Sequence, residues 1–179
     1  MSPLTEENMM KETRPIFKLF FSALIFIFTF SVNAFAEDGK IVLTNKVFKQ
    51  VIKKDKDGST TYDYIEPGTA LPGDVMMYII TFENIGDSPA EGIVVNDPVP
   101  NNSEYRVGSA FGKNTNITFS IDGGKSFGNP EELVVKDKNG QQWTAKPESY
   151  THIRWVYSKP LAPGEKGEVS FKTKIKNNE

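Results

Sequence analysis

Residues 75–84 read Val-Met-Met-Tyr-Ile-Ile-Thr-Phe-Glu-Asn, and both alternating sets of side chains are apolar as far as Thr81. Successive side chains of a strand point to opposite faces, so a run that is apolar on both sides predicts a central strand of a packed sheet. We expect Tyr78, Ile80 and Phe82 to face inward. This stretch indicates a β-rich fold. After the N-terminal apolar run, no segment of about 12 residues shows helical periodicity.

Two later segments alternate strictly between apolar and polar residues, as half-buried strands do. In the first, Ile153, Trp155 and Tyr157 share one face, and in the second, at residues 169–176, Val169 and Phe171 begin the apolar face. Further strand candidates are residues 41–52, 93–97, 105–110 and 117–121. Lys172, Lys174 and Lys176 would form a solvated edge, with a binding stripe as the alternative.

Turn sequences separate these runs. Asp55-Lys56-Asp57-Gly58 and Asp137-Lys138-Asn139-Gly140 each lie between two strand-like segments, and Asp-Gly and Asn-Gly supply the positive φ that tight hairpins require. Short strands with turns at intervals of about 8–12 residues are typical of a sandwich or barrel. We therefore predict an all-β fold, an immunoglobulin-like antiparallel β-sandwich, preceded by an N-terminal signal helix.

The composition excludes several classes of function. The chain has 179 residues, a formal net charge of −2, no cysteine and one histidine. Near-neutral charge gives no electrostatic basis for nucleic-acid binding. The missing cysteines remove disulfides, cysteine nucleophiles and cysteine-bound zinc, and one histidine cannot make a multi-histidine metal site within one chain. We predict no cofactor.

The N-terminus has the pattern of an export signal. Lys11, Arg14 and Lys18 precede an uncharged run from Leu19 to Val32, and the sequence Asn-Ala-Phe-Ala ends at Ala36. A basic start, a short apolar run and an Ala-x-Ala site predict a signal peptide over residues 1–36. The run is shorter than the about 20 residues of a spanning helix, and an uncleaved anchor is the alternative. We expect an exported protein, periplasmic or extracellular, that meets the membrane only during export unless the signal is uncleaved.

The remaining chain divides into two parts. Residues 37–66 predict an N-terminal β-hairpin extension that adds strands to a sheet edge, and residues 67–176 form the main module.

An ordered set of motifs runs through the main module. The motifs are Leu71-Pro72-Gly73-Asp74, Tyr78, Asn84-Ile85-Gly86-Asp87, residues 95–100 (VNDPVP), Tyr105-Arg106-Val107-Gly108-Ser109, residues 120–127 (SIDGGKSF), Ile153-Arg154-Trp155 and Leu161-Ala162-Pro163-Gly164-Glu165. In order and spacing this set resembles the conserved-repeat domain of bacterial and archaeal surface proteins, the domain of unknown function numbered eleven. The resemblance implies an immunoglobulin-like sandwich on envelope or surface proteins, usually in tandem arrays, and no recognised catalytic residues. This chain has a single copy and no attachment signal, which favours a free periplasmic or secreted module.

One short motif suggests a hydrolase. Gly124-Lys125-Ser126-Phe127-Gly128 matches the Gly-x-Ser-x-Gly nucleophile pattern, which needs a strand, a sharp turn and then a helix. Asn129-Pro130 follows instead, so a glycine-rich hairpin is the favoured interpretation. The only histidine, His152, lies in a predicted strand, where a solvated position is the ordinary interpretation. A phosphate loop is excluded because Phe119 stands where its first glycine belongs.

Other residues point to ligands without a complete pattern. Asp55 and Asp57 resemble part of a calcium loop, but Lys53 and Tyr64 stand where an EF-hand has its first acid and its late glutamate. A looser calcium site would use Asp74, Asp87 or Asp97. Met76 and Met77 point to opposite faces of a strand and cannot share a copper ion.

Large aromatic side chains are mostly buried, so we expect Trp143 to pack over the end of the sandwich. A solvent-exposed platform for sugar binding is the alternative.

The leading hypothesis is an exported, non-enzymatic β-sandwich module. It would act in the cell envelope through protein–protein or structural contacts with an unknown envelope or surface protein, its exposed edge strands adding a partner strand. The alternatives are a sugar- or calcium-binding module, or a secreted hydrolase.

Overall fold

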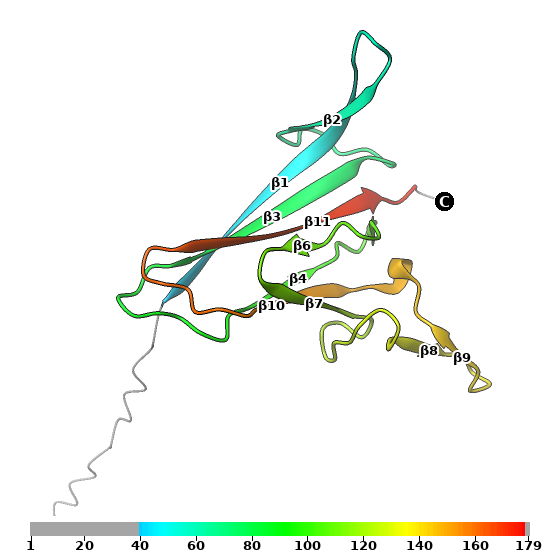
Figure 1. Cartoon of the computed structure of the whole chain (residues 1–179). Coiled ribbons are helices and arrows are strands. Elements are labelled where there is room, and N and C mark those ends of the chain that lie inside the picture. Colours follow the sequence, from blue (N-terminus) through cyan, green and yellow to red (C-terminus); the bar gives the residue numbers. More distant parts are fainter. Residues whose placement is uncertain (1–39, 178–179) are drawn as a thin grey trace, which may run out of the picture. The chain divides into compact units, whose positions relative to one another are not determined.

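The computed structural model describes residues 40–177 and has two antiparallel sheets packed face to face, with no α-helix among these residues (Figure 1). The strands are β1 (Ile41–Lys54), β2 (Thr60–Ile65), β3 (Val75–Asn84), β4 (Val94–Pro98), β5 (Ser103–Tyr105), β6 (Phe111–Gly112), β7 (Thr115–Ser120), β8 (Val134–Lys136), β9 (Gln142–Thr144), β10 (His152–Tyr157) and β11 (Lys166–Ile175). The 3₁₀ turn η1 spans Pro147–Ser149. The predicted all-β sandwich is confirmed. The predicted signal peptide and its helix lie outside the described residues.

The first sheet has the strand order β2-β1-β3-β11-β5, and β6 also pairs with β11. The second sheet has the order β4-β10-β7, and β8 and β9 form a separate hairpin (Figure 1). The last two strands, β10 and β11, lie in different sheets. A constant-type immunoglobulin domain instead keeps its last two strands together, so this chain has the two-layer architecture with its own strand order.

Strand β1 pairs with two neighbouring strands. Ile41 to Gln50 pair with β3, and Lys49 to Lys54 pair with β2 across the Asp55–Gly58 turn. The segment predicted as a hairpin extension thus adds two strands to the edge of the first sheet, as expected. The second predicted hairpin, at Asp137–Gly140, joins β8 and β9.

The core lies between the sheets and is rich in aromatic rings. Trp155 of β10 and Phe171 of β11 are fully buried, and their ring centroids are 5.9 Å apart. Phe82 of β3 is 1% exposed and contacts the ring of Tyr157 edge-on, at 5.2 Å. The predicted inward set of β3 is confirmed for Ile80 and Phe82, and Tyr78 is partly buried and stacks on Phe171 at 4.8 Å.

Gly167 makes room for this core. A Cβ atom at Gly167 would lie 2.1 Å from the ring of Phe82, its cross-strand partner. Any side chain there would displace Phe82, so the glycine is needed for close approach of β11 to the core.

Asn84 ties two loops together at one end of the sandwich. Its side chain is fully buried and donates hydrogen bonds to the carbonyls of Ser88 (2.7 Å) and Leu161 (2.8 Å), and it accepts one from the Gly86 N–H (3.0 Å). The Asn84–Asp87 turn is therefore anchored to the loop that leads from β10 to β11.

The prediction of a strand at residues 105–110 was wrong. Strand β5 ends at Tyr105, and the chain then turns, with Gly108 at a φ of 73° and the Ser109 N–H bonded to the Arg106 carbonyl at 3.1 Å. The Tyr105 hydroxyl accepts a hydrogen bond from the Ala110 N–H at 3.1 Å, which holds the turn against β5. The apolar residues of this segment therefore belong to a folded loop and not to a hydrogen-bonded strand.

Trp155 is the central packing residue, and its replacement tests the arrangement. We expect Trp155→Ala to lower the free energy of unfolding by about 3–5 kcal/mol, because it leaves a large cavity between the sheets. Urea denaturation measures the loss. Trp143→Ala is the matched control, since Trp143 is 44% exposed, and it should cost less than about 1 kcal/mol. Equal losses for the two variants would contradict the assigned core.

Candidate functional site

The Gly124–Gly128 motif is a turn organised by Asp122. The Asp122 Oδ1 accepts hydrogen bonds from the N–H groups of Lys125 and Ser126, both at 3.0 Å, and the Ser126 hydroxyl donates to Oδ2 at 2.6 Å. These donors hold the pKa of the Asp122 carboxyl well below its usual range. Phe119 and Gly128 form a bridge that closes the loop as a hairpin. Ser126 is thus bonded to a carboxylate in a turn, which is not the strand–turn–helix setting of a nucleophile.

His152 lies beside this turn and is partly buried. Its Nδ1 is 3.2 Å from the Thr151 hydroxyl, and its ring would be 3.3 Å from a Cβ at Gly124. The glycine therefore lets the turn rest on the imidazole. The neighbouring Arg154 guanidinium lies 3.7 Å from the centre of the Phe127 ring, which fixes the other end of the turn.

The carboxylates considered as calcium ligands do not form a shared site. Those of Asp74 and Asp57 bind other groups of the protein. Asp74 forms an ion pair with Lys49 (2.7 Å), which lowers the pKa of its carboxyl, and it accepts the Leu71 N–H. Asp57 caps the hairpin turn by accepting the Ser59 N–H at 3.0 Å. Across residues 40–177, no group of three or more His, Cys, Asp or Glu side chains is placed to hold a metal ion.

The two methionines lie on opposite faces, as expected for adjacent strand residues. Met76 is 4% exposed and faces the interior, whereas Met77 lines a hollow on the outer face.

Asp97 is a carboxylate that faces the interior of the sandwich. It lies on β4 between the buried residues Val95 and Val99, and its Oδ2 is buried without a hydrogen-bond partner among the described residues. The Thr173 hydroxyl and the Trp155 Nε1 are also buried without partners there. Burial raises the pKa of Asp97 to about 6. The charged form of Asp97 therefore opposes folding.

The pH dependence of stability follows from this shift. The folded-state pKa of Asp97 is above its ordinary value of 3.8, so its contribution to stability falls as pH rises from about 4 to about 6 and is then constant. We expect Asp97→Asn to raise the free energy of unfolding by about 1–3 kcal/mol at pH 8 and by little at pH 4. Urea denaturation at both pH values measures this difference. Exposed Asp87→Asn is the control, and a gain for Asp97→Asn that was equal at both pH values would contradict the assignment.

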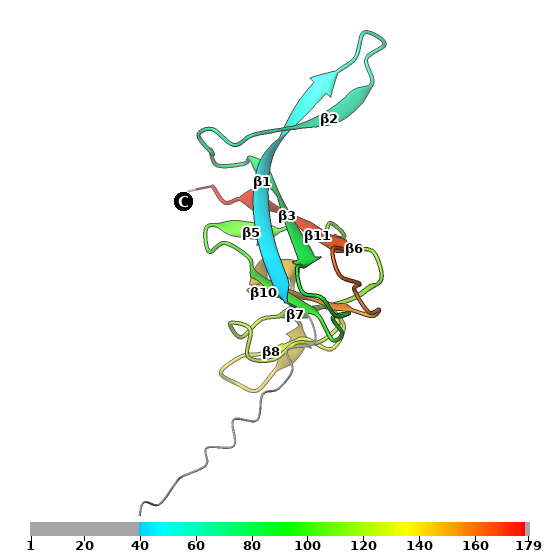
Figure 2. The same cartoon turned by 90° about the vertical axis from the view of Figure 1, so that its left-hand side faces the viewer.

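The β1–β2 hairpin extends beyond the rest of the first sheet as an arm (Figures 1 and 2). We define the arm as residues 51–65. Pairing of β1 with β3 stops at Gln50, so beyond that residue β1 has only β2 as a neighbour. The outer edge of β2 has no pairing strand among the described residues.

The arm carries apolar side chains in solvent. Ile52 and Tyr62 are directly opposite each other in the register and are 68% and 57% exposed. Ile65 is 46% exposed. Such a cross-strand pair stabilises a hairpin modestly. The pair buries little of its own surface, and contiguous exposed apolar patches often mark interaction sites in proteins.

A hollow of about 520 Å³ lies beside the arm on the outer face of the first sheet, and we call it the arm hollow. Its lining includes Tyr62 from the arm, Met77 from β3, Arg106 from the loop after β5, Phe111 from β6 and Lys172 from β11. Phe111 is 65% exposed. Apolar side chains from two separate parts of the chain therefore border one hollow with basic groups in its wall.

Lys172 fixes the base of the arm. Its Nζ donates hydrogen bonds to the Tyr64 hydroxyl and to the Gln50 Oε1, the latter at 3.3 Å, and lies 5.1 Å from the centre of the Tyr64 ring. These contacts join β11 to the arm across β3. The sequence alone suggested a solvated lysine edge, and the structure assigns Lys172 a positioning contact.

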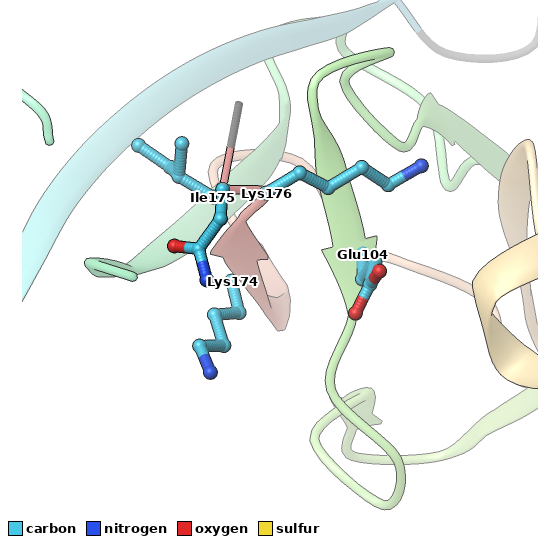
Figure 3. Close-up of a pocket in the computed structure, with 5 residues that line it drawn as sticks. Glu104, Lys174, Ile175 and Lys176 are labelled. Carbon is cyan, nitrogen blue, oxygen red and sulfur yellow. The ribbon is translucent and has the colours of Figure 1, made fainter. Parts of the chain in front are cut away.

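Lys174 and Lys176 belong to a different surface. A shallow polar pocket of about 500 Å³ lies at the end of β11, lined by these lysines, Ile175, Asn177 and Glu104 of β5 (Figure 3). Figure 3 shows the two ammonium groups pointing away from each other, so they do not converge on one ligand.

Trp143 lies on the β8–β9 hairpin and is 44% exposed. The expectation that it packs over the end of the sandwich was wrong. Its strand partner Val135 is partly buried, and within residues 40–177 no third strand pairs with this short hairpin.

No family model, curated protein or solved structure matches this chain. In the part of the chain that the structure describes, no helix has the length and apolar character needed to cross a membrane.

Proposed function

We propose that this protein is an exported, non-enzymatic β-sandwich module that binds a protein partner in the cell envelope through the arm and the arm hollow. The observation that carries the proposal is the exposed pair Ile52 and Tyr62, beside a hollow that Phe111 borders from the other side. Exposed aromatic and aliphatic side chains around a concave, partly basic surface are the usual centre of a protein interface.

The free edge of β2 supports the same proposal. Its backbone N–H and C=O groups on that edge have no ladder partner among the described residues. A partner segment that paired with β2 would extend the first sheet at this edge. Contact by strand addition thus needs no rearrangement of the sandwich.

The proposed compartment rests on the N-terminal sequence. The basic residues, the apolar run and the Ala-x-Ala site favour export. The resemblance to conserved-repeat surface domains favours the envelope and a contact role. The absence of cysteine is compatible with export because the aromatic core supplies the stability that disulfides give many small secreted domains.

The arm can be tested by replacing its exposed side chains. We expect Ile52→Ser with Tyr62→Ser to leave the free energy of unfolding within about 1 kcal/mol, because both are exposed, and to weaken partner binding at least about tenfold. The measurement compares partners recovered from envelope fractions by the wild type and the variant, followed by affinity measurement for the recovered partner.

Val94→Ser with Val134→Ser is the matched control, since these side chains are 45% and 40% exposed at sites outside the arm. A partner retained by the arm variant and lost by the control would contradict the proposal.

A sugar-binding role is the second candidate, and exposed Trp143 is the observation that favours it. An exposed indole ring provides a flat apolar face for stacking. We expect Trp143→Ala to abolish any rise in melting temperature that oligosaccharides produce, while Val134→Ala on the neighbouring strand keeps it. Equal responses of the two variants would exclude Trp143 as the platform.

A further inference from the structure

A second, largely apolar cleft lies on the opposite side of the molecule's core from β1. It has a volume of about 620 Å³ and opens where β5 of the first sheet and β7 of the second sheet diverge. The loop after β5 forms one wall, and the other wall consists of Pro130, Glu131, Thr144, Ala145 and Pro147. Pockets of about 300–1,000 Å³ suit small organic ligands.

Three aromatic rings form the floor of this cleft. The rings of Phe119 and Tyr150 stack with centroids 4.7 Å apart, and the Tyr105 ring lies 5.2 Å from Phe119 and 5.9 Å from Tyr150. All three side chains are at most 7% exposed. The floor is therefore a rigid aromatic surface that belongs to the core, so the cleft is preformed.

Polar groups converge at one side of the floor. Tyr150 is 7% exposed and lines the cleft together with Tyr105 and Glu131. The Tyr105 hydroxyl already accepts the Ala110 N–H. Tyr105, Glu131 and Tyr150 line the same cleft, and burial, followed by the nearby Tyr105 and Glu131, raises the pKa of Tyr150.

The charge of the cleft selects among ligands. Glu131 is its one charged lining residue, and no lysine, arginine or histidine lines the cleft within residues 40–177. The Glu131 carboxylate makes no ion pair with a described residue. An anionic ligand would meet an acidic group with no compensating cation, whereas a cationic head would meet a carboxylate, two hydroxyls and aromatic rings.

We propose that this cleft binds a small organic amine with an aromatic or aliphatic body. The apolar body rests on Tyr105, Phe119 and Tyr150, and the ammonium group donates hydrogen bonds to the Glu131 carboxylate and to the Tyr150 hydroxyl oxygen. The site is separate from the arm, so this inference does not rest on the proposed partner contact.

Calorimetric titration with three probes of one shape tests the charge selection. The probes are phenethylamine, 2-phenylethanol and 3-phenylpropionate, which differ in the charge of the head group. We expect the amine to bind at least about tenfold more tightly than the alcohol, and the acid not to bind in the millimolar range. Equal affinity for the three probes, or binding of the acid alone, would overturn the proposal, as would no binding of the amine.

Variants test the assigned residues. We expect Glu131→Gln to weaken binding of the amine about tenfold and to leave the affinity for the alcohol unchanged. We expect Tyr150→Phe to weaken binding of the amine while the aromatic floor stays in place. Glu148→Gln is the matched control because Glu148 is exposed on the adjacent turn and does not line the cleft. An equal loss in Glu148→Gln would show a nonspecific charge effect and overturn the site.

The arm variant Ile52→Ser/Tyr62→Ser separates this inference from the proposed function. It should bind phenethylamine with wild-type affinity. Loss of amine binding in that variant would place the amine at the arm and contradict the cleft.

Discussion

The packing of Trp155 against Phe171, between β10 and β11, holds the two sheets together. The chain has no cysteine, so no disulfide links one sheet to the other. Each of the two strands also lies in the middle of its sheet, between β4 and β7 in one case and β3 and β5 in the other. The positions of the edge strands, and of the surfaces that they form, therefore depend on this central contact.

The two sheets differ in width, and the proposed sites follow from that difference. The first sheet continues past β3 to β1 and β2, whereas the second ends at β4. Beyond the covered part, β1 and β2 have no facing sheet, and the exposed side chains of the arm result from this lack of cover. On the other side, short β5 and β7 diverge beneath a loop and leave the aromatic-floored cleft. Both surfaces are therefore built by the ends of a rigid core.

Several buried polar groups lower the stability of that core. Asp97, Thr173 and Trp155 each present a buried atom that lacks a hydrogen-bond partner among the described residues. Such atoms lower the stability of a sandwich that has no disulfide to compensate. Protonation of Asp97 removes the charge in this region, so the interior is more stable in mildly acidic solution than at neutral pH with respect to this group.

The sequence alone determined the all-β class, the two hairpins at Asp55–Gly58 and Asp137–Gly140, and the inward positions of Ile80, Phe82 and Trp155, because alternation and turn chemistry are local. It did not determine the end of β5 at Tyr105, the exposure of Trp143 or the bonding of Ser126 to Asp122. Only the tertiary structure decided these, since each depends on which distant segment covers a given side chain. The arm hollow and the cleft also depend on tertiary structure. The residues that line the arm hollow run from Gln50 to Lys172, and those that line the cleft run from Tyr105 to Tyr150, so the packing of distant segments brings them together.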